Sequence, residues 1–353
     1  MAVASSKRSR STGLVGRLVR GHSESTTGDR IIGVSLAIAA IIPTGILVFL
    51  AYQMVRTAWP AIWFNGWQFF TTTTFTLGNL YATGSVQVHN GYEAPPGAHY
   101  GVLPLLFGTA VSSGLALLFA LPVAVGGALV LAEKVPARLQ GPLGIFLELL
   151  AGIPSVIFGL WGIYALGPFL SQTLYPAIAS LHIPWLSGPV GAGQGLLTGG
   201  LVLAVMIIPI IASITRELIR SVSPVTREAA HALGLTHFEG VRVVVSPFIR
   251  TGVVAAAVLG LARALGETIA ILIISGNALN IYPQNIYSPF STMAATIAAF
   301  LDSALTDSTG MAVSSLAEVG IILLLLTLVT NFGGRWIARR FSGDAGLPVG
   351  RGV

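Results

Sequence analysis

Six long runs of apolar residues, separated by shorter polar segments, dominate the pattern of this chain. A bilayer core requires about 20 predominantly apolar residues per helix, and each run reaches that length. The runs stay apolar throughout instead of alternating with polar residues, so they predict helices and exclude a transmembrane barrel. The pattern therefore predicts an all-α, polytopic membrane protein whose spans lie near residues 31–55, 103–132, 143–170, 197–219, 248–275 and 313–338.

The composition supports this class. Hydrophobic residues make up 54% of the 353 residues and charged residues only 9%, whereas a soluble domain carries about 25% charged residues. Soluble, disordered and fibrous classes are therefore excluded. The chain contains no cysteine, which excludes disulfides, thiolate metal sites and a cysteine nucleophile. We expect no metal site and no catalytic residues.

Positive charges gather on alternate connections. Of the 19 Lys and Arg residues, 17 lie in the N-terminal segment, in the loops at 133–142 and 216–250, and in the C-terminal tail. Cytoplasmic loops of membrane proteins carry an excess of Lys and Arg. The charges therefore predict that both termini are cytoplasmic, and they explain the net charge of +6 without any nucleic acid.

The same pattern divides the chain into four parts. A basic cytoplasmic segment, 1–30, precedes the first helix with its long extracytoplasmic segment, 31–102. A five-helix core follows at 103–338, with one sizeable cytoplasmic loop at 216–250, and a short cytoplasmic tail ends the chain at 339–353.

The first extracytoplasmic segment is rich in aromatic residues. Two interpretations remain open: an aromatic belt at the membrane interface, which Trp and Tyr commonly form, or a docking surface for an external partner. The aromatic residues are Trp59, Trp63, Phe64, Trp67, Phe69 and Phe70.

The loop at 216–250 carries a motif. Glu228, Ala229 and Ala230 are followed three residues later by Gly234, and an apolar run then leads to Pro247. In type and spacing this resembles the EAA loop of ABC importer permeases. The resemblance implies a short helix that docks into a separate ATPase subunit and carries its motion into the membrane. The alternative is an ordinary amphipathic helix with Glu228 as a solvated charge.

Local signals place this helix. Pro224 is suited to the first helical position, with Ser223 as the cap before it, and Gly234 allows the chain to turn out of the helix. His231 and His237 also lie in the loop, and we expect them to be surface residues because no third metal ligand accompanies them.

The chain lacks the residues for ATP hydrolysis. Its two lysines, Lys7 and Lys134, do not follow glycine, so no phosphate-binding loop of the G-x-x-x-x-G-K type exists. We therefore expect a non-enzymatic permease that binds no cofactor itself, with ATP-Mg used by a partner subunit.

Two charges fall inside the fifth predicted span. Arg263 and Glu267 are four residues apart, which places them on one face of a continuous helix, and small residues surround them there. Ionisable residues within a span mark functional sites by default. Arg263 offers a planar fork of donors that suits an oxyanion, and Glu267 would hold it when no anion is present. The alternative is that the two residues merely neutralise each other.

Pro154 interrupts the third span, and such breaks occur inside protein or at a cavity. Ser155 then becomes a candidate for hydrogen bonding a passing solute, although a packing kink explains the break equally well. Glu148 and Glu318 lie near helix ends, and we expect them to form hydrogen bonds between helices or to cap helix ends.

Beyond the EAA loop, the chain resembles the PstC-type permeases of phosphate ABC importers from about residue 28 onward. The resemblance implies the type I, MetI-like permease fold, a bacterial plasma-membrane location, and Arg263 and Glu267 on the phosphate path. It also implies a PstA-type permease partner, a PstB-type ATPase dimer and a PstS-type binding protein. The matching runs are Gly28–Gly33, Ala58–Ile62, Leu103–Thr109, Gly152–Gly162, the EAA loop and Arg263–Thr268.

Three alternatives stay open at this point. A permease for sulfate, molybdate or another oxyanion would use the same arginine fork. An ion-coupled secondary transporter or channel could use Arg263 and Glu267 as a relay, but it would leave the EAA loop without a role. A membrane scaffold or sensor without flux is the third.

Overall fold

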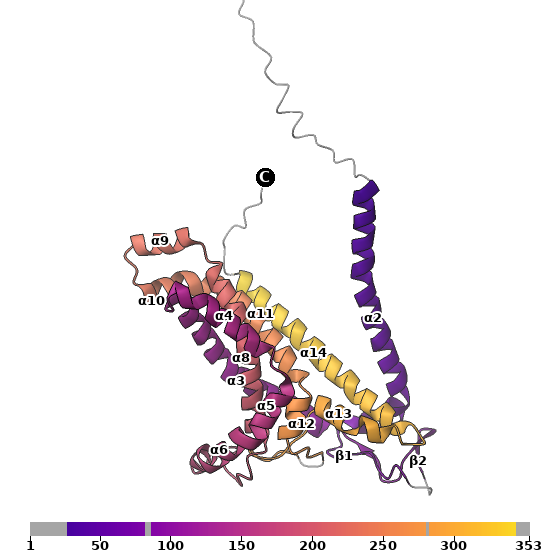
Figure 1. Cartoon of the computed structure of the whole chain (residues 1–353). Coiled ribbons are helices and arrows are strands. Elements are labelled where there is room, and N and C mark those ends of the chain that lie inside the picture. Colours follow the sequence, from indigo (N-terminus) through magenta and orange to yellow (C-terminus); the bar gives the residue numbers. More distant parts are fainter. Residues whose placement is uncertain (1–26, 82–85, 280–281, 344–353) are drawn as a thin grey trace, which may run out of the picture. The chain divides into compact units, whose positions relative to one another are not determined.

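The computed structural model describes residues 27–81, 86–279 and 282–343 (Figure 1). Its contacts divide the chain into two units, Met1–Gln53 and Met54–Val353. The first helix, α2 (Thr27–Asn65), begins in the first unit and ends in the second. All packing described below belongs to the second unit.

Helices form most of the second unit. Short turns, breaks and loops separate them, and three are short 3-10 or π-helical turns, labelled η. In chain order, after α2, they are η1 (Gly66–Phe70), α3 (Leu103–Glu133), α4 (Ala137–Ala151), α5 (Ser155–Trp161), η2 (Gly162–Leu166), α6 (Gly167–Gln172), α7 (Leu174–Ala179), α8 (Leu196–Arg220), α9 (Pro224–Ala232), α10 (His237–Gly240), η3 (Val241–Val245), α11 (Ser246–Leu265), α12 (Ile269–Ile274), α13 (Met293–Ala304) and α14 (Met311–Gly343).

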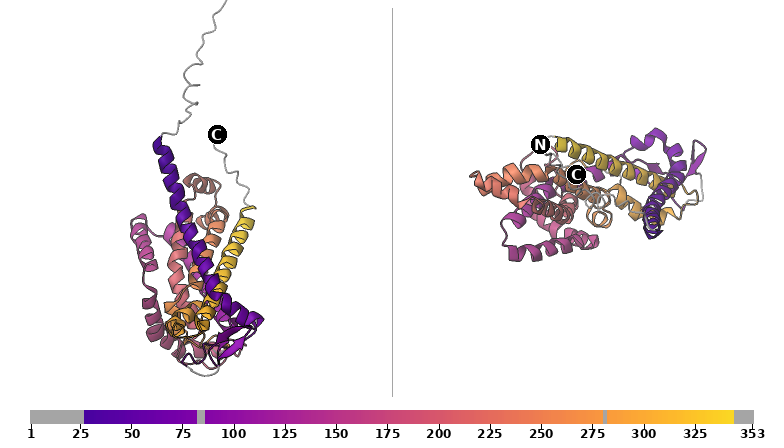
Figure 2. Two further views of the ribbon diagram at one scale, coloured as in Figure 1. Left: turned by 90° about the vertical axis from the view of Figure 1, so that its right-hand side faces the viewer. Right: turned by 90° about the horizontal axis from the view of Figure 1, so that it is seen from above.

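Four short strands lie between η1 and α3. β1 (Phe75–Thr76) pairs antiparallel with β4 (His99–Tyr100), and β2 (Gln87–His89) pairs antiparallel with β3 (Tyr92–Ala94). Figure 2 shows these strands, in purple, near the beginning of α14, in yellow. These strands contribute to a hydrophobic core of their own region, separate from the main core around α8. Its buried residues come from η1, the strands and α14, among other elements.

Six helices of the described residues are long and apolar enough to cross a membrane, as the sequence predicted. Their bounds differ from the prediction at several ends, because apolar pattern alone does not locate helix ends. The spans are Ile41–Phe70, Leu103–Glu133, Ser155–Gln172, Leu196–Arg220, His237–Leu265 and Met311–Arg340.

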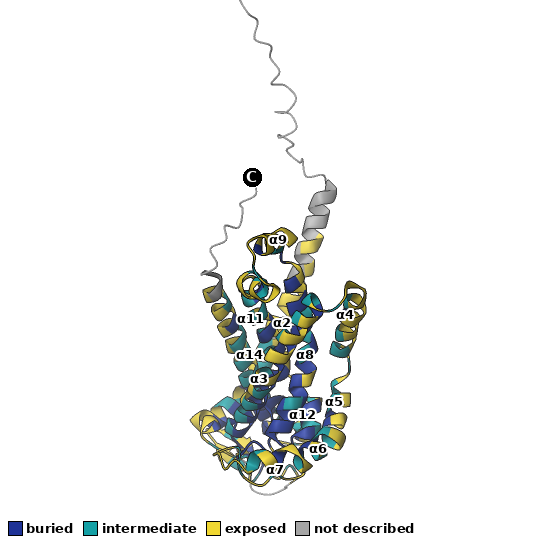
Figure 3. Cartoon of the chain, turned by 90° about the vertical axis from the view of Figure 1, so that its left-hand side faces the viewer, coloured by how far each residue is buried: buried dark blue, intermediate teal, exposed yellow. Residues whose placement is uncertain are grey.

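The helix α8 forms the centre of the main core. Within the most apolar stretch of α8, 67% of the residues are buried. Figure 3 shows α8 mostly dark blue, the colour of buried residues. Small residues allow neighbouring helices to approach closely. A β-carbon on Gly200 of α8 would lie 2.8 Å from the Leu115 Cβ of α3, and one on Gly260 of α11 would lie 2.9 Å from the Ile211 side chain of α8. α3 and α11 therefore both pack directly on α8.

Two parts of the prediction need correction. The segment predicted as an outer loop, 276–312, contains the helix α13, which is apolar but only 12 residues long. The third span, predicted at 143–170, is two separate helices, because α4 ends at Ala151 and α5 begins at Ser155. Proline at 154 causes this break, as predicted, because it cannot donate a backbone hydrogen bond and restricts the residue before it.

Candidate translocation and coupling sites

The fifth span breaks between its two charged residues. α11 ends at Leu265, and the amide of Gly266 donates to the carbonyls of Ala262 and Arg263, at 3.3 and 3.2 Å. Glu267 lies in the connection before α12 begins at Ile269. The prediction of one continuous helix was therefore wrong. Glycine is a poor helix former, and the hydroxyl of Thr268 donates to the Gly266 carbonyl at 3.2 Å, which stabilises the interruption.

The break separates Arg263 from Glu267. Among the described residues no ion pair joins the two, so the mutual neutralisation considered from the sequence is not formed in this structure. Arg263 is exposed, and Glu267 is half-buried. The shared helical face predicted for the pair does not exist.

Small residues of α11 pack against α8. A β-carbon on Gly252 would lie 2.4 Å from the Leu218 side chain of α8, and Ala256 is 1% exposed. Leu259, one turn before Arg263, is 55% exposed. α11 therefore packs on α8 with its small residues, while Leu259 and Arg263 near its end are exposed.

Ser155 begins the helix α5, which packs on α12, the helix that follows this break. A β-carbon on Gly159 would lie 3.0 Å from the Ala270 Cα, and one on Gly162 would lie 2.6 Å from the Ile274 side chain. Residue numbers increase in the same direction along both helices, so α5 and α12 run parallel and begin at the same end of their contact.

Two helix breaks thus precede the packed pair α5 and α12. The first turn of α5 begins there with half-buried Ser155, and the last turn of α11 ends there with Arg263 about one turn, or roughly 5 Å along the axis, before Gly266. A guanidinium, a hydroxyl and backbone groups freed by the breaks are the types of group that bind an oxyanion.

The motif resembling an EAA loop forms the helix α9. It begins at Pro224 after Ser223, as predicted, although the Ser223 side chain makes no capping hydrogen bond. Glu228 and Ala229 are exposed, and Gly234 adopts φ +78°, the left-handed conformation that glycine tolerates best. The prediction of a short exposed helix followed by a turn at Gly234 is confirmed.

Pro247, the last residue of the motif, does not interrupt the helix. It lies in the continuous helical stretch His237–Leu265. The π-helical turn η3 precedes it, and the Ser246 amide donates to the Val241 carbonyl. Proline lacks an amide hydrogen and crowds the preceding helical turn, and a wider turn absorbs this conflict. Arg242, assigned to the loop from the sequence, also lies in this turn.

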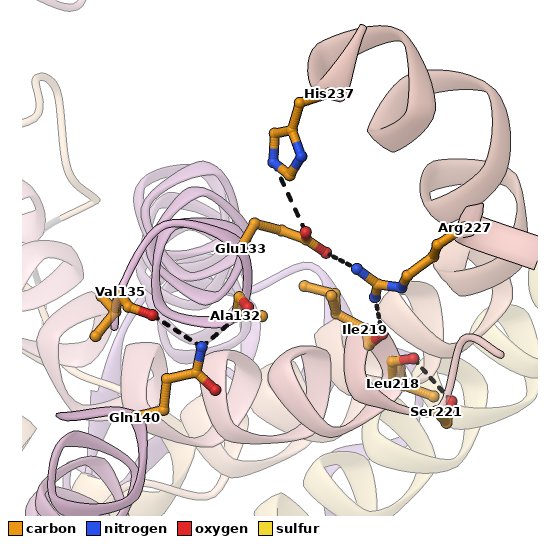
Figure 4. A network of polar contacts seen from close by, with 9 residues as sticks. All are labelled: Ala132, Glu133, Val135, Gln140, Leu218, Ile219, Ser221, Arg227 and His237. Atoms are coloured by element: carbon orange, nitrogen blue, oxygen red, sulfur yellow. Dashed lines mark hydrogen bonds and ion pairs between the residues drawn. The ribbon is translucent and has the colours of Figure 1, made fainter. Parts of the chain in front are cut away.

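Sequence analysis missed a polar network at the end of the bundle that carries α9 (Figure 4). One Arg227 nitrogen lies 2.5 Å from Glu133 Oε1, and another donates to the Ile219 carbonyl at 2.6 Å. His237 Nε2 lies 3.7 Å from Glu133 Oε2. The sequence offered only one signal for it, a carboxylate at the end of the second apolar run.

A second connection joins α4 to α8 at the same end. Arg216 is only 5% exposed and donates to the Gln140 carbonyl at 2.7 Å. The Gln140 side chain donates to the carbonyls of Ala132 and Val135, at 3.3 and 2.9 Å (Figure 4). The positive charges of this region therefore include buried structural residues as well as surface ones.

The two remaining acidic residues behave differently. Glu318 of α14 accepts a hydrogen bond of 2.7 Å from Asn65 at the end of α2, and both residues are buried. The predicted bond between helices is confirmed for Glu318. Glu148 is exposed, and its expected role as a partner stays a prediction.

Comparison with known families defines the class of protein. Residues 124–343 match the model of the family described as binding-protein-dependent transport system inner membrane component. A solved bacterial alginate ABC transporter has the same fold, with a TM-score of 0.55 at 17% identity over 89% of this chain and 97% of that one. The chain belongs to this family of ABC transporter permeases, which are membrane subunits without catalytic activity.

Relatives narrow the class further. The chain is 50% identical over 321 residues to a protein of Mycobacterium tuberculosis named phosphate transport system permease protein PstC 1, covering 90% of this chain and 94% of the relative. It is 35% identical over 323 residues to the PstC protein of Mesorhizobium japonicum, covering 90% and 92%. Within the family the chain is of the PstC type.

Proposed function

We propose that this chain is the subunit through which inorganic phosphate crosses a bacterial plasma membrane, as one half of a phosphate path in an ATP-driven importer. The names of its relatives support the substrate. The observation that carries the proposal is the exposed Arg263, one turn before the helix break that α12 follows, with Ser155 at the start of the helix α5 that packs on α12.

An arginine at this depth cannot face lipid at low cost. Because Arg263 is exposed in the single chain, its open side is the natural place for a second, PstA-type permease to close a water-filled path. Phosphate passing there would meet the bidentate fork of Arg263 and the Ser155 hydroxyl. Glu267, close by but unpaired with Arg263, would weaken the grip so that the anion can leave.

The energy for transport comes from outside this chain. We assign ATP-Mg binding and hydrolysis to a PstB-type ATPase dimer, which docks on α9 around Glu228, Ala229, Ala230 and Gly234, with Pro247 in the helix that follows. A PstS-type binding protein would deliver phosphate at the opposite end. This arrangement places both termini in the cytoplasm, in agreement with the distribution of Lys and Arg.

Reconstitution tests the proposal. The full complex with its PstA-, PstB- and PstS-type partners is placed in lipid vesicles, and uptake of radiolabelled phosphate is measured with and without ATP. We expect uptake that requires ATP and is inhibited by excess unlabelled phosphate but not by sulfate or molybdate. Inhibition by sulfate or molybdate instead would assign the other oxyanion, and uptake without an ATPase would refute the importer.

A further inference from the structure

The coupling helix α9 has little packing of its own. Among its nine residues Ala230 is the buried one, and Figure 3 shows the helix mostly exposed. Val225 is 72% exposed, and Glu228 is exposed as well. A helix with so little buried surface cannot pass a displacement to the bundle through hydrophobic packing alone, so another connection must carry it.

Arg227 supplies such a connection. Its guanidinium reaches away from α9 and joins two other helices: Glu133 in the last turn of α3, at 2.5 Å, and the Ile219 carbonyl at the end of α8, at 2.6 Å. The two contacts use different nitrogens of one rigid, planar group. A displacement of α9 toward or away from either contact therefore acts on α3 and α8 together.

The environment makes this contact stronger than a surface ion pair. The Glu133 side chain is 9% exposed and the Arg227 side chain 29%. Exposed pairs contribute little, because water screens them, whereas removing one partner of a buried pair leaves an uncompensated charge. His237 Nε2 of α10 lies 3.7 Å from the other Glu133 oxygen.

The helices that Arg227 contacts lead to the proposed phosphate path. α8 packs on α11 through Gly252 and Gly260, which lie against Leu218 and Ile211. α11 carries Arg263 in its last turn. A movement that enters at Ile219 and Glu133 therefore reaches Arg263 through directly packed helices.

We propose that Arg227 and Glu133 form the linkage that converts movement of α9 into movement of α3 and α8. Arg227 is a positioning residue, not a phosphate ligand. This inference rests on the proposed function, because it presumes that an ATPase moves α9. It assigns the transmission to one ion pair and not to the exposed residues of the motif.

The test uses the full complex reconstituted in vesicles. Radiolabelled inorganic phosphate is added outside the vesicles, and ATP is supplied to the ATPase. Three variants are compared with the unchanged chain: Arg227→Gln, Glu133→Gln and the double variant. Arg220→Gln is the matched control, because Arg220 is a nearby arginine, 44% exposed, that contacts Glu217 and Gln140 but not α9. Phosphate taken up, ATP hydrolysed and co-purified ATPase are measured together.

We expect each single variant to retain its ATPase and to hydrolyse ATP while phosphate taken up per ATP falls about fivefold or more, within the usual range of coupling free energies. The double variant should fall no further than the singles, since residues acting as one unit are not additive. Arg220→Gln should take up as much phosphate per ATP hydrolysed as the unchanged chain does.

Three results would overturn the linkage: an unchanged ratio in Arg227→Gln, additive losses in the double variant, or loss of the ATPase from the purified complex. Additive losses would mean that Arg227 and Glu133 act independently, and loss of the ATPase would mean that Arg227 contacts it directly. Failure of the proposed function is distinguishable, because the complex with the unchanged chain would then take up no phosphate.

Discussion

The buried hydrogen bond between Asn65 and Glu318 allows a quantitative prediction. It joins the end of α2 to α14 at 2.7 Å, and the two residues are 7% and 5% exposed. Asn65→Leu keeps the number and branching of the side-chain heavy atoms but removes the donor, which leaves a buried carboxyl group without this partner. A buried group left unsatisfied costs about 1–3 kcal/mol. For a chain of this size that lowers the midpoint of thermal unfolding by roughly 1–4 °C.

Two matched variants separate the hydrogen bond from simple packing. Glu318→Gln keeps an oxygen that accepts from Asn65, so its midpoint should stay within about 1 °C of the unchanged chain. The double variant Asn65→Leu/Glu318→Leu removes both polar groups and should recover most of the lost stability, because replacing both partners by apolar groups is nearly neutral. The assay is thermal unfolding of the purified protein in detergent. A double variant less stable than Asn65→Leu would refute the reasoning.

Two further predictions concern the proposed path and the coupling helix. Gly159→Ala places a β-carbon 3.0 Å from the Ala270 Cα, so α5 must move off α12, at a net cost of about 0–2 kcal/mol after the gain in helix propensity, and phosphate uptake should fall; Gly126→Ala, with open space around it, should leave uptake unchanged, and equal uptake in both would contradict a role in transport for the packing of α5 on α12. Glu228→Lys reverses an exposed charge on α9 and should reduce co-purification of the ATPase or phosphate taken up per ATP, whereas a fully coupled complex would argue against docking there.

Long apolar runs made the membrane-spanning helices predictable. A run of 20 apolar residues has few folded alternatives, so six spans follow from the sequence alone. Local chemistry also located α9, because Pro224 favours a helix start and Gly234 favours a left-handed turn. Both signals depend only on neighbouring residues, and the structure agrees with both.

Features that depend on tertiary context were not predictable. A single glycine within an apolar run, such as Gly266, is compatible with a continuous helix or a break, and the choice separated Arg263 from Glu267. The contact between Arg227 and Glu133 joins residues 94 positions apart, and no periodicity connects them. α13 is too short to be recognised as a span, since its 12 residues fall below the required length.

The exposure of Arg263 is likewise a tertiary property. Small residues at Gly252, Ala256 and Gly260 predicted close packing, and the structure places that packing against α8. Arg263 and Leu259 are exposed, whereas Ala256 and Gly260 are buried. Helical periodicity alone does not predict this difference, because it depends on which neighbouring helix covers each part of α11.

The central claim is that Arg263 lines the route of phosphate, and Arg263→Gln in the reconstituted importer tests it most directly. Glutamine keeps much of the side-chain length but loses the charge and the bidentate fork. Arg335→Gln, at an exposed arginine of α14, is the control. The account predicts an assembled complex in which ATP-dependent uptake of labelled phosphate falls to background for Arg263→Gln and stays normal for Arg335→Gln. Normal uptake by Arg263→Gln would contradict it.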